Sequence, residues 1–226
     1  MISIIIPTFN EAENLRRGLD QLSSQSPPPQ IIIADGGSSD ATLAIAAEYN
    51  AHIVSAPKGR GRQLEAGALL AQGSILFFLH ADCQFPAGGL QAIQRHLDDQ
   101  RDCVGGNFRL HFDGESNFAQ WLTRFYGWIR ERGLYYGDSG IFVRRDVYLR
   151  LCGMRPLDLM EDYDFSRRLE KAGQTVCVTQ PALTTSSRKF EGKWGPAIVW
   201  GWLKIHALYY LGVSPKKLAS AYYGKG

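Results

Sequence analysis

Short apolar runs that end abruptly at polar residues recur through the first hundred residues of the chain. Runs of about four to eight apolar residues bounded by turn-forming residues are typical of strands covered on both faces. We therefore expect buried strands at Ile2–Ile6, Ile31–Ala34 and Ile75–Leu79, and a short strand at His52–Ser55. The segments that follow these strands predict helices at residues 10–24, 39–49, 63–71 and 86–98.

Strands and helices alternate regularly in this first part of the chain. Such alternation predicts an α/β fold, with a mostly parallel central sheet flanked by helices. We expect Asn10 to cap the first helix, with Glu13 as its capping-box partner. Polar residues follow each strand, and the carboxyl edge of an open α/β sheet is where ligands bind. These polar residues are Asn10 and Glu11, Asp35, Lys58, and His80 with Asp82.

The second part of the chain is less regular. Alternating apolar positions predict a strand over Phe108–Phe112, and helical spacing predicts helices at residues 117–132 and 160–173. Two further short strands are expected at residues 140–143 and 175–178. Because we find neither an internal repeat nor a low-complexity linker, we expect one domain over residues 1–226. It divides into a regular half (1–100), an irregular half (101–190) and an apolar helix (194–213).

The C-terminal helix expected at residues 194–213 is rich in Trp, Tyr, Leu and Ile. Lys204 and His206 interrupt it, which argues against a membrane-spanning segment. Two interpretations stay open. The helix either lies on a membrane as an interfacial helix, or it docks onto the core or pairs two subunits in a homodimer.

Composition narrows the class of protein. The chain has 226 residues, of which 45% are hydrophobic and 21% charged, as in ordinary globular proteins. The net charge of +3 is too small to indicate nucleic-acid binding. The four cysteines are widely spaced and form no CxxC pair, which indicates reduced thiols in an intracellular protein. With no signal-peptide pattern at the start, we expect a cytoplasmic protein, either free or peripheral on the inner face of the membrane.

Three loops at the predicted sheet edge carry candidate binding chemistry. Pro7–Glu11 either lines a base or ribose site or forms a plain turn and helix cap. Asp35, followed by two glycines, either accepts from a nucleobase or belongs to a glycine-rich turn. Lys58–Arg62 places three cations in a flexible loop, which suits phosphates or is simply solvated.

Carboxylates supply two further candidates. Asp82 can hold Mg²⁺ or Mn²⁺ at the end of its strand, with pyrophosphate oxygens completing the coordination shell, or it can cap a helix. Glu161, Asp162 and Asp164 open a predicted helix, where the helix dipole favours negative charge. The alternative is that this group contains a general base for an acceptor hydroxyl.

These motifs, in this order, resemble the family 2 glycosyltransferases with the GT-A (Rossmann-like) fold, over nearly the whole chain. The family pattern is P-x-x-N-E, a D-G-S-x-D loop, a basic loop, a D-x-D strand end and an E-D pair. Here Asp35–Asp40 contains one extra Gly. A small bacterial subgroup, associated with arsenosugar biosynthesis, is closer still. Its F-L-H-A-D, G-D-x-x-I-F-V-R-R, M-E-D and L-G-V-S-P segments match residues 78–82, 137–145, 160–162 and 211–215.

The resemblance implies a role for each matched residue. Asp82 would coordinate the metal, Asp162 would be the base, and Glu161 would position the base or the acceptor. His80 stands where the family has its first Asp, as a substitute ligand, a nucleotide contact or a structural replacement. The nucleoside, most often uridine, would be held by Pro7, Thr8, Asn10, Glu11 and Asp35, and the phosphates by Lys58, Arg62 and Arg188.

The implied reaction is an inverting transfer of a sugar from a nucleoside-diphosphate sugar to an acceptor hydroxyl, with Mg²⁺ or Mn²⁺. The resemblance identifies neither sugar nor acceptor. A sugar-phosphate nucleotidyltransferase is one rival, although its basic loop normally follows the first strand rather than the third. A non-catalytic, membrane-associated nucleotide-sugar-binding protein is the other. In the basic loop, Glu65 replaces the family's usual Asn and either contacts the donor sugar or is solvated.

Overall fold

The structure is a computed structural model that describes residues 1–114, 116–187 and 195–224. Its strands alternate with helices through the first part of the chain, as the sequence predicts. The strands are β1 (Ile2–Thr8), β2 (Gln30–Asp35), β3 (His52–Ser55), β4 (Ile75–Phe78), β5 (Cys83–Gln84), β6 (Cys103–Phe112), β7 (Ile141–Arg144) and β8 (Gln174–Thr185).

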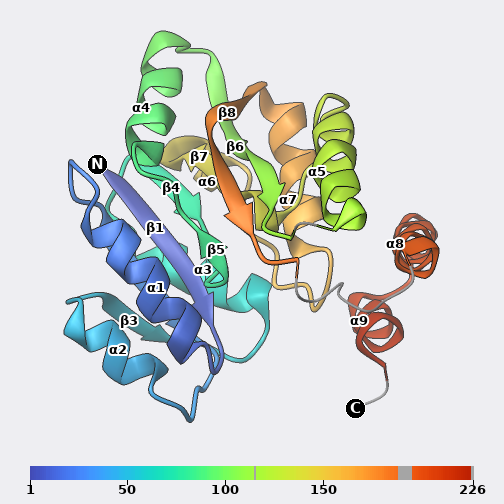
Figure 1. Ribbon diagram of the computed structural model, residues 1–226, viewed down its shortest axis with the longest axis horizontal. Helices are drawn as coiled ribbons and strands as arrows, with labels where there is room; N and C mark the ends of the chain where they lie inside the picture. The colour runs from blue at the N-terminus through green and yellow to red at the C-terminus, as the bar shows by residue number, and fades with distance from the viewer. Residues whose placement is uncertain (115, 188–194, 225–226) are drawn as a thin grey trace.

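The helices flank this sheet, and the last two lie to one side of it (Figure 1). They are α1 (Ala12–Ser23), α2 (Thr42–Glu48), α3 (Arg60–Leu70), α4 (Gly89–Asp99), α5 (Asn117–Arg130), the 3₁₀ turn η1 (Gly137–Ser139), α6 (Arg145–Arg150), α7 (Glu161–Ala172), α8 (Gly195–Tyr210) and α9 (Pro215–Tyr223).

Among the described residues, the strands form one sheet in the order β3-β2-β1-β4-β7-β6-β8-β5. Strands β1 to β4 are mutually parallel, β7 runs antiparallel between β4 and β6, and β6 and β8 are parallel to each other. The short β5 closes one edge antiparallel to β8. The sheet is therefore mostly parallel, and β7 begins beside the end of β4 and runs back along it, with Ile141 paired to Phe78 and Arg144 to Ile75.

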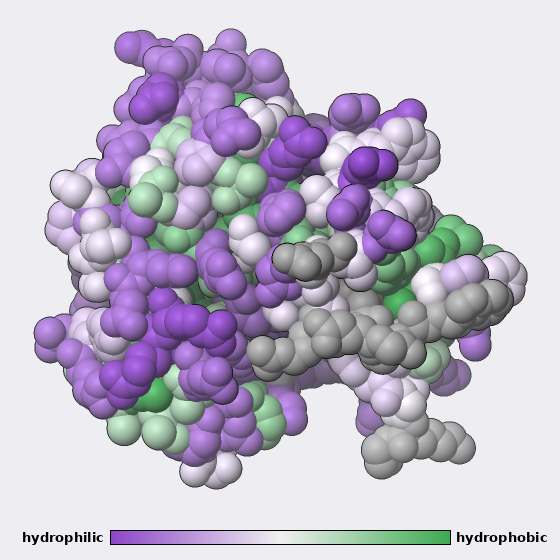
Figure 2. Space-filling model, viewed as in Figure 1, coloured by the Kyte–Doolittle hydropathy of each residue, from purple (hydrophilic) through white to green (hydrophobic). Residues whose placement is uncertain are grey.

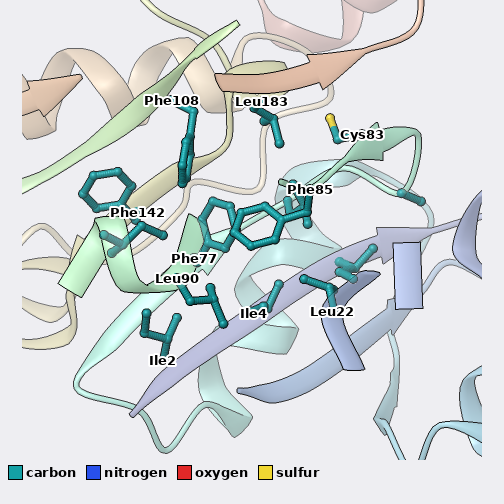
Figure 3. Packing of buried hydrophobic residues seen from close by; sticks show 14 of the residues in the cluster. Ile2, Ile4, Leu22, Phe77, Cys83, Phe85, Leu90, Phe108, Phe142 and Leu183 are labelled. Carbon is teal, nitrogen blue, oxygen red and sulfur yellow. The ribbon is translucent and has the colours of Figure 1, made fainter. Parts of the chain in front are cut away.

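Side chains of one strand alternate between two apolar layers because successive residues point to opposite faces. Ile4 and Ile6 of β1 join the layer covered by α1, α2, α4 and α5, whereas Ile5 joins the layer covered by α3, α6 and α7. Figure 3 shows the first layer, where the Phe77 ring lies 5.3 Å from Phe85 and 5.7 Å from Phe108 between ring centroids. Burial on both faces explains why these strands read as continuous apolar runs.

A third, smaller apolar cluster attaches α8 and α9 to the start of α7. Its buried members are Leu159, Met160, Tyr163, Ile205 and Leu218. In the part of the chain that is described, no helix has both the length and the apolarity that crossing a bilayer requires.

Two predictions about helix ends are wrong. Asn10 does not cap α1, because its backbone adopts a φ of 55° and its side chain bonds the loop after β2 instead. The α1 amide of Ala12 donates to Asp40 Oδ2 at 3.1 Å, so the cap comes from another loop. The helix expected at residues 194–213 ends at Tyr210 and is followed by α9; Trp194 lies outside the described residues.

Two further bounds differ from expectation. Helix α3 begins at Arg60 rather than at residue 63, so it includes part of the basic loop. Strand β8 extends well beyond residues 175–178, to Thr185, although polar residues and Pro181 interrupt its apolar pattern. Its ladder with β6 shifts register between the Phe108 and Leu110 pairs, which accommodates the interruption.

Candidate active site at the carboxyl edge of the sheet

The carboxyl ends of β1 and β2 are joined by their polar side chains. Thr8 and Asp35 are paired residues in the ladder, and Thr8 Oγ1 donates to Asp35 Oδ1 at 3.2 Å. The buried Gln63 of α3 donates from Nε2 to the carbonyl oxygens of Thr8 and Ala34, both at 2.8 Å. Its Oε1 accepts from the Gly59 amide at 3.2 Å. Gln63 therefore connects the basic loop to both strand ends.

The loops after β1 and β2 hold each other in place. The Asn10 amide donates to Ser38 Oγ at 2.9 Å, and the Ser39 amide donates to Asn10 Oδ1 at 2.8 Å. The Glu11 amide donates to Thr42 Oγ1 at 2.9 Å. Pro7–Glu11 and the glycine-rich loop are thus one cross-linked unit, which explains the positive φ of Asn10.

Asp35 accepts four hydrogen bonds within this unit. Oδ1 accepts from Thr8 Oγ1 and, at 2.5 Å, from Ser38 Oγ; Oδ2 accepts from the amides of Gly37 and Ser38 at 2.8 and 2.9 Å. Burial raises the pKa of Asp35, but the bonds from Ser38 and Gly37 outweigh it and hold the pKa below its usual value. An ionised carboxylate with all its acceptor sites in use is a rigid anchor for the loop. Its contact with a nucleobase stays a prediction.

The cations of the basic loop contact three different groups. Lys58 Nζ lies 3.5 Å from the centroid of the Phe9 ring, so this side chain covers the loop after β1. Arg62 forms an ion pair with Asp158, with 2.8 Å between Nη2 and Oδ1. Arg60 forms another with Glu161, with 2.7 Å between Nε and Oε1. The loop therefore joins the two halves of the chain.

Close packing permits these ion pairs. A Cβ atom on Gly61 would lie 2.5 Å from the carbonyl oxygen of Arg155 and 3.2 Å from Cβ of Glu161. Only a glycine allows α3 to approach the segment before α7 this closely. The predictions from sequence named Arg60 only as one of three loop cations and did not include Gln63 or Asp158. The glycines on both sides of Arg60 were the available signal for a close approach.

His80 and Asp82 lie in a tight turn between β4 and β5, in which the Cys83 amide donates to the His80 carbonyl at 3.2 Å. Both side chains are partly exposed. Cys83 itself is buried, with Sγ 3.6 Å from the carbonyl oxygen of Asp138. The buried Cys83 therefore anchors the turn, and the imidazole of His80 and the carboxylate of Asp82 lie at the sheet edge.

His80 and Asp162 meet at Gly137. A Cβ atom on Gly137 would lie 2.9 Å from His80 Nε2 and 3.2 Å from Asp162 Oδ2. The Gly137 amide donates to Asp162 Oδ2 at 2.8 Å, and the Tyr163 amide donates to Oδ1 at 2.7 Å. These bonds orient the carboxylate of Asp162, a residue that is 8% exposed. The turn after β4 and the start of α7 thus each place a side chain next to Gly137. Gly137 matched the subgroup pattern, but sequence gave it no such role.

The residue before Glu161 and Asp162 has a strained backbone conformation. Met160 precedes α7 with a φ of 68°, a conformation that L-residues with long side chains rarely adopt. Glu161, next in the chain, is almost fully buried, and burial raises its pKa to about 7, while Arg60 lowers it and Asp162 raises it. Strain and a perturbed carboxyl pKa in adjacent residues are features that accompany functional sites.

Aromatic side chains of α8 border the start of α7. The His206 Nδ1 lies 2.8 Å from the Trp202 carbonyl, which can only accept, so Nδ1 carries the proton. Its Nε2 therefore accepts from Tyr136 OH at 2.9 Å. Burial, with Tyr163 and Asp162 nearby, raises the pKa of Tyr136, so its hydroxyl stays protonated.

The candidate metal ligands at the sheet edge can be compared with the coordination shell that a divalent ion requires. Among the described residues, no three His, Cys, Asp or Glu side chains gather to form a complete site. Asp82 and His80 are available from the turn between β4 and β5. Mg²⁺ and Mn²⁺ are commonly held by one or two protein ligands, with phosphate oxygens and water completing the shell. The residues fit a metal that is bound together with a phosphate ligand.

Two predicted residues remain outside this geometry. Arg188 lies outside the described residues. Glu65 is partly exposed, and its Oε2 accepts from Tyr148 OH at 2.5 Å and from the Met154 amide at 3.0 Å. Glu65 therefore fixes the loop after α6, and its contact with a donor sugar stays a prediction.

The chain resembles known proteins in both sequence and structure. The model of the family described as glycosyl transferase family 2 matches residues 3–149. Glycosyltransferase AglE of Haloferax volcanii is 27% identical over 195 residues, which cover 77% of this chain and 63% of AglE. The chain thus spans less than two thirds of that relative's length.

Solved structures share the fold at low sequence identity. S. aureus TarS 1-349 in complex with UDP gives a TM-score of 0.65 at 16% identity, over 82% of this chain and 60% of TarS 1-349. The mannosyltransferase PcManGT of Pyrobaculum calidifontis, in complex with GDP-Man and Mn²⁺, gives 0.66 at 16% identity. That match covers 98% of this chain and 72% of PcManGT.

Proposed function

Because the chain belongs to glycosyl transferase family 2 and has the GT-A fold, we propose that it is a metal-dependent, inverting glycosyltransferase. It would move a sugar from a nucleoside-diphosphate sugar, with UDP-sugars the first donors to test, to an acceptor hydroxyl. One observation carries the proposal: His80 and Asp162, from the two halves of the chain, converge on Gly137 at the carboxyl edge of the sheet.

Asp162 has the geometry of a general base. Its two carboxylate oxygens are held by the amides of Gly137 and Tyr163, which fixes its direction, and the residue is buried, with 8% of its surface exposed. In the proposed reaction it takes the proton of the acceptor hydroxyl as the oxygen attacks the anomeric carbon. The nucleoside diphosphate leaves from the opposite face, so the configuration inverts and no covalent enzyme intermediate forms. Such a base typically contributes about 10²- to 10⁴-fold to the rate.

The donor would bind along the ends of β1, β2 and β4. In this arrangement Pro7, Thr8, Asn10, Glu11 and Asp35 shape the nucleoside site, and their cross-linked loops supply a rigid wall. Lys58 and Arg62 lie in the adjoining basic loop. Their present partners, an aromatic ring and a partly exposed carboxylate, are groups that a diphosphate can displace.

Asp82 and His80 would hold the divalent metal together with the diphosphate. When bound, Mg²⁺ or Mn²⁺ neutralises the charge that develops on the leaving diphosphate. PcManGT was solved with GDP-Man and Mn²⁺, and TarS with UDP, which supports testing both nucleotides with Mn²⁺. The arsenosugar-associated subgroup, and with it any acceptor, stays a prediction from sequence resemblance.

Two rival functions lead to different measurements. A sugar-phosphate nucleotidyltransferase would form a nucleotide sugar from a nucleoside triphosphate and a sugar phosphate. A non-catalytic nucleotide-sugar-binding protein would bind the donor without turning it over. The ordered carboxylate at Asp162 favours the transferase, because a binding protein has no use for an oriented base.

A donor screen tests the proposal. Thermal unfolding is measured with UDP- and GDP-sugars, each with and without Mn²⁺ or Mg²⁺, because a tight ligand raises the melting temperature by mass action. Release of nucleoside diphosphate from the best donor is then followed over time. We expect one donor class to stabilise the protein in a metal-dependent way and to be hydrolysed slowly without an acceptor. Pyrophosphate release from a nucleoside triphosphate and a sugar phosphate would instead identify the nucleotidyltransferase.

A further inference from the structure

The outward side of α8 is apolar, the reverse of an ordinary surface helix. Its exposed positions follow helical spacing along one side and include a single charge. Trp200 is 70% exposed, Leu203 59%, Tyr210 68% and Leu211 79%. The remaining exposed positions on this side are Pro196, Ala197, Lys204 and Ala207.

The apolar surface continues from α8 onto α5. Phe125 of α5 stacks on Trp202 of α8, with 6.4 Å between ring centroids and 13° between ring planes. On either side of Phe125, Trp121 and Trp128 are 40% and 52% exposed. Figure 2 shows hydrophobic residues gathered at the side of the molecule where Figure 1 places α8. We refer to Trp121, Trp128, Trp200, Leu203, Tyr210 and Leu211 as the aromatic face.

The charge on α8 and α9 has one sign. From residue 195 to residue 224 the sequence contains Lys204, Lys216 and Lys217 and no Asp or Glu. All three lysines are exposed. On α5, Arg124 is exposed as well, and the Arg132 guanidinium lies 3.9 Å above the Trp128 ring. A partner of this surface must therefore accept apolar and aromatic groups and supply negative charge.

A second copy of the chain lacks that negative charge. In a two-fold symmetric dimer the same patch meets itself, which would bring Lys204 of each copy to a surface without carboxylates on α8 or α9. A bilayer with anionic headgroups supplies both requirements, because Trp and Tyr favour the membrane interface and lysines favour anionic lipid. We propose that the aromatic face docks on an anionic lipid bilayer, with α8 lying in the plane of the interface.

Docking there brings the membrane close to the candidate base. The side of α8 opposite the aromatic face contacts the start of α7 through Ile205 and His206, which accepts from Tyr136, while Tyr210 at the edge of the aromatic face hydrogen-bonds Tyr163 through its OH. Tyr136 and Tyr163 immediately precede Gly137 and follow Asp162, respectively. If the proposed function holds, the acceptor hydroxyl belongs to a molecule held at the bilayer surface, since α8 joins that surface to the residues next to Asp162.

Vesicle sedimentation tests the docking. The full chain is mixed with vesicles of phosphatidylcholine alone, or of phosphatidylcholine with about one third phosphatidylglycerol. We expect at least a tenfold preference for the anionic vesicles that weakens at high salt. The paired change Trp200→Ser with Leu203→Ser, and separately Lys216→Glu with Lys217→Glu, should each reduce binding about tenfold or more.

Matched controls keep the result interpretable. Leu149→Ser changes an apolar residue that is 61% exposed on α6, and Lys171→Glu reverses an exposed charge at the end of α7. Both should bind vesicles like the unchanged protein. Circular dichroism and the donor-induced thermal shift should stay unchanged in every variant, which separates a failure of docking from a failure of the proposed function. Three results would overturn the proposal: equal binding to both vesicle types, no binding to either, or a stable dimer that the paired change Trp200→Ser with Leu203→Ser dissociates.

Discussion

Arg60 and Glu161 form an ion pair between the first turns of α3 and α7, with 2.7 Å between Nε and Oε1. The Glu161 side chain is 2% exposed and the Arg60 side chain 40% exposed. The pair connects the basic loop of the first half to the residue that precedes Asp162. It therefore couples the place where a diphosphate would bind to the place where the candidate base is held.

The change Arg60→Ala leaves a buried carboxylate without its cation. Losing one partner of a buried pair costs about 3–5 kcal/mol, and the exposed guanidinium reduces this to about 1–3 kcal/mol here. Urea unfolding at neutral pH measures the loss. The control Arg150→Ala removes a pair in which both side chains are well exposed and should cost under about 0.5 kcal/mol. Equal effects of the two changes would contradict a buried role for Arg60.

Glu161 gives stability a definite pH dependence. Its folded pKa is about 7, against an ordinary value of 4.5, mainly because of burial. The folded protein keeps this proton between those values while the unfolded chain releases it, so raising the pH through this window favours unfolding. We expect the free energy of unfolding to fall by more in the unchanged protein than in Glu161→Gln between about pH 5 and pH 8. Parallel pH profiles for the two proteins would refute the assignment.

The change Asp162→Asn removes the proposed base and keeps the side-chain shape. We expect sugar transfer to fall about 10²- to 10⁴-fold while the donor-induced thermal shift is retained. Asp146→Asn changes an exposed carboxylate in the first turn of α6 and should leave the rate unchanged. An Asp162→Asn protein with full transfer activity would show that another group accepts the proton.

The change Gly137→Ala tests the convergence of His80 and Asp162. The added methyl would lie 2.9 Å from His80 Nε2 and 3.2 Å from Asp162 Oδ2, so at least one of these side chains must move. We expect a folded protein, destabilised by about 1–2 kcal/mol, with transfer reduced more than donor binding. Gly127→Ala on α5 adds a methyl group with no atom within 4 Å and should be neutral or stabilising. Wild-type kinetics in Gly137→Ala would argue against a shared site.

The change Asp82→Asn tests the metal. We expect the part of the donor-induced thermal shift that requires Mn²⁺ to disappear, while any metal-independent nucleotide shift remains. Asp98→Asn, at an exposed position of α4, serves as the control. His80→Asp should retain metal dependence, and a change in its metal preference would mark His80 as a ligand. A full Mn²⁺ response in Asp82→Asn would place the metal elsewhere.

The first half of the fold was predictable because β1, β2 and β4 are buried on both faces, whereas β3 is mostly exposed. Because both faces of β1, β2 and β4 are buried, successive positions are apolar whichever face they lie on, as at Ile4 and Phe77. Each apolar run therefore marks a strand directly. The β8 strand was predicted at less than its true length, since Pro181 and its polar neighbours interrupt the pattern. Only the register shift against β6, which sequence does not show, allows the strand to continue.

The site was predictable in its parts but not in its contacts. Of the motif residues, Asp35 ends β2 and Asp162 lies in the first turn of α7, as the pattern indicates, whereas Asp82 lies in the turn between β4 and β5. The partners of Arg60 and Arg62 lie about a hundred residues away in sequence, and which cation meets a carboxylate depends on how closely α3 packs against α7. Asn10 shows the same limit. Its local pattern favours a cap, but a loop from β2 offers its side chain better partners.

The pairing of β5 with β8 bears on the order in which the protein is made. Cys83, next to Asp82, pairs with Thr185, which is 102 residues further along the chain. Strands β1 to β4 can associate as soon as residue 78 has been synthesised. The turn that carries Asp82 gains its strand partner only when synthesis reaches the end of β8. A nascent chain therefore contains strands β1 to β4 well before it contains the strand partner of the turn that carries Asp82.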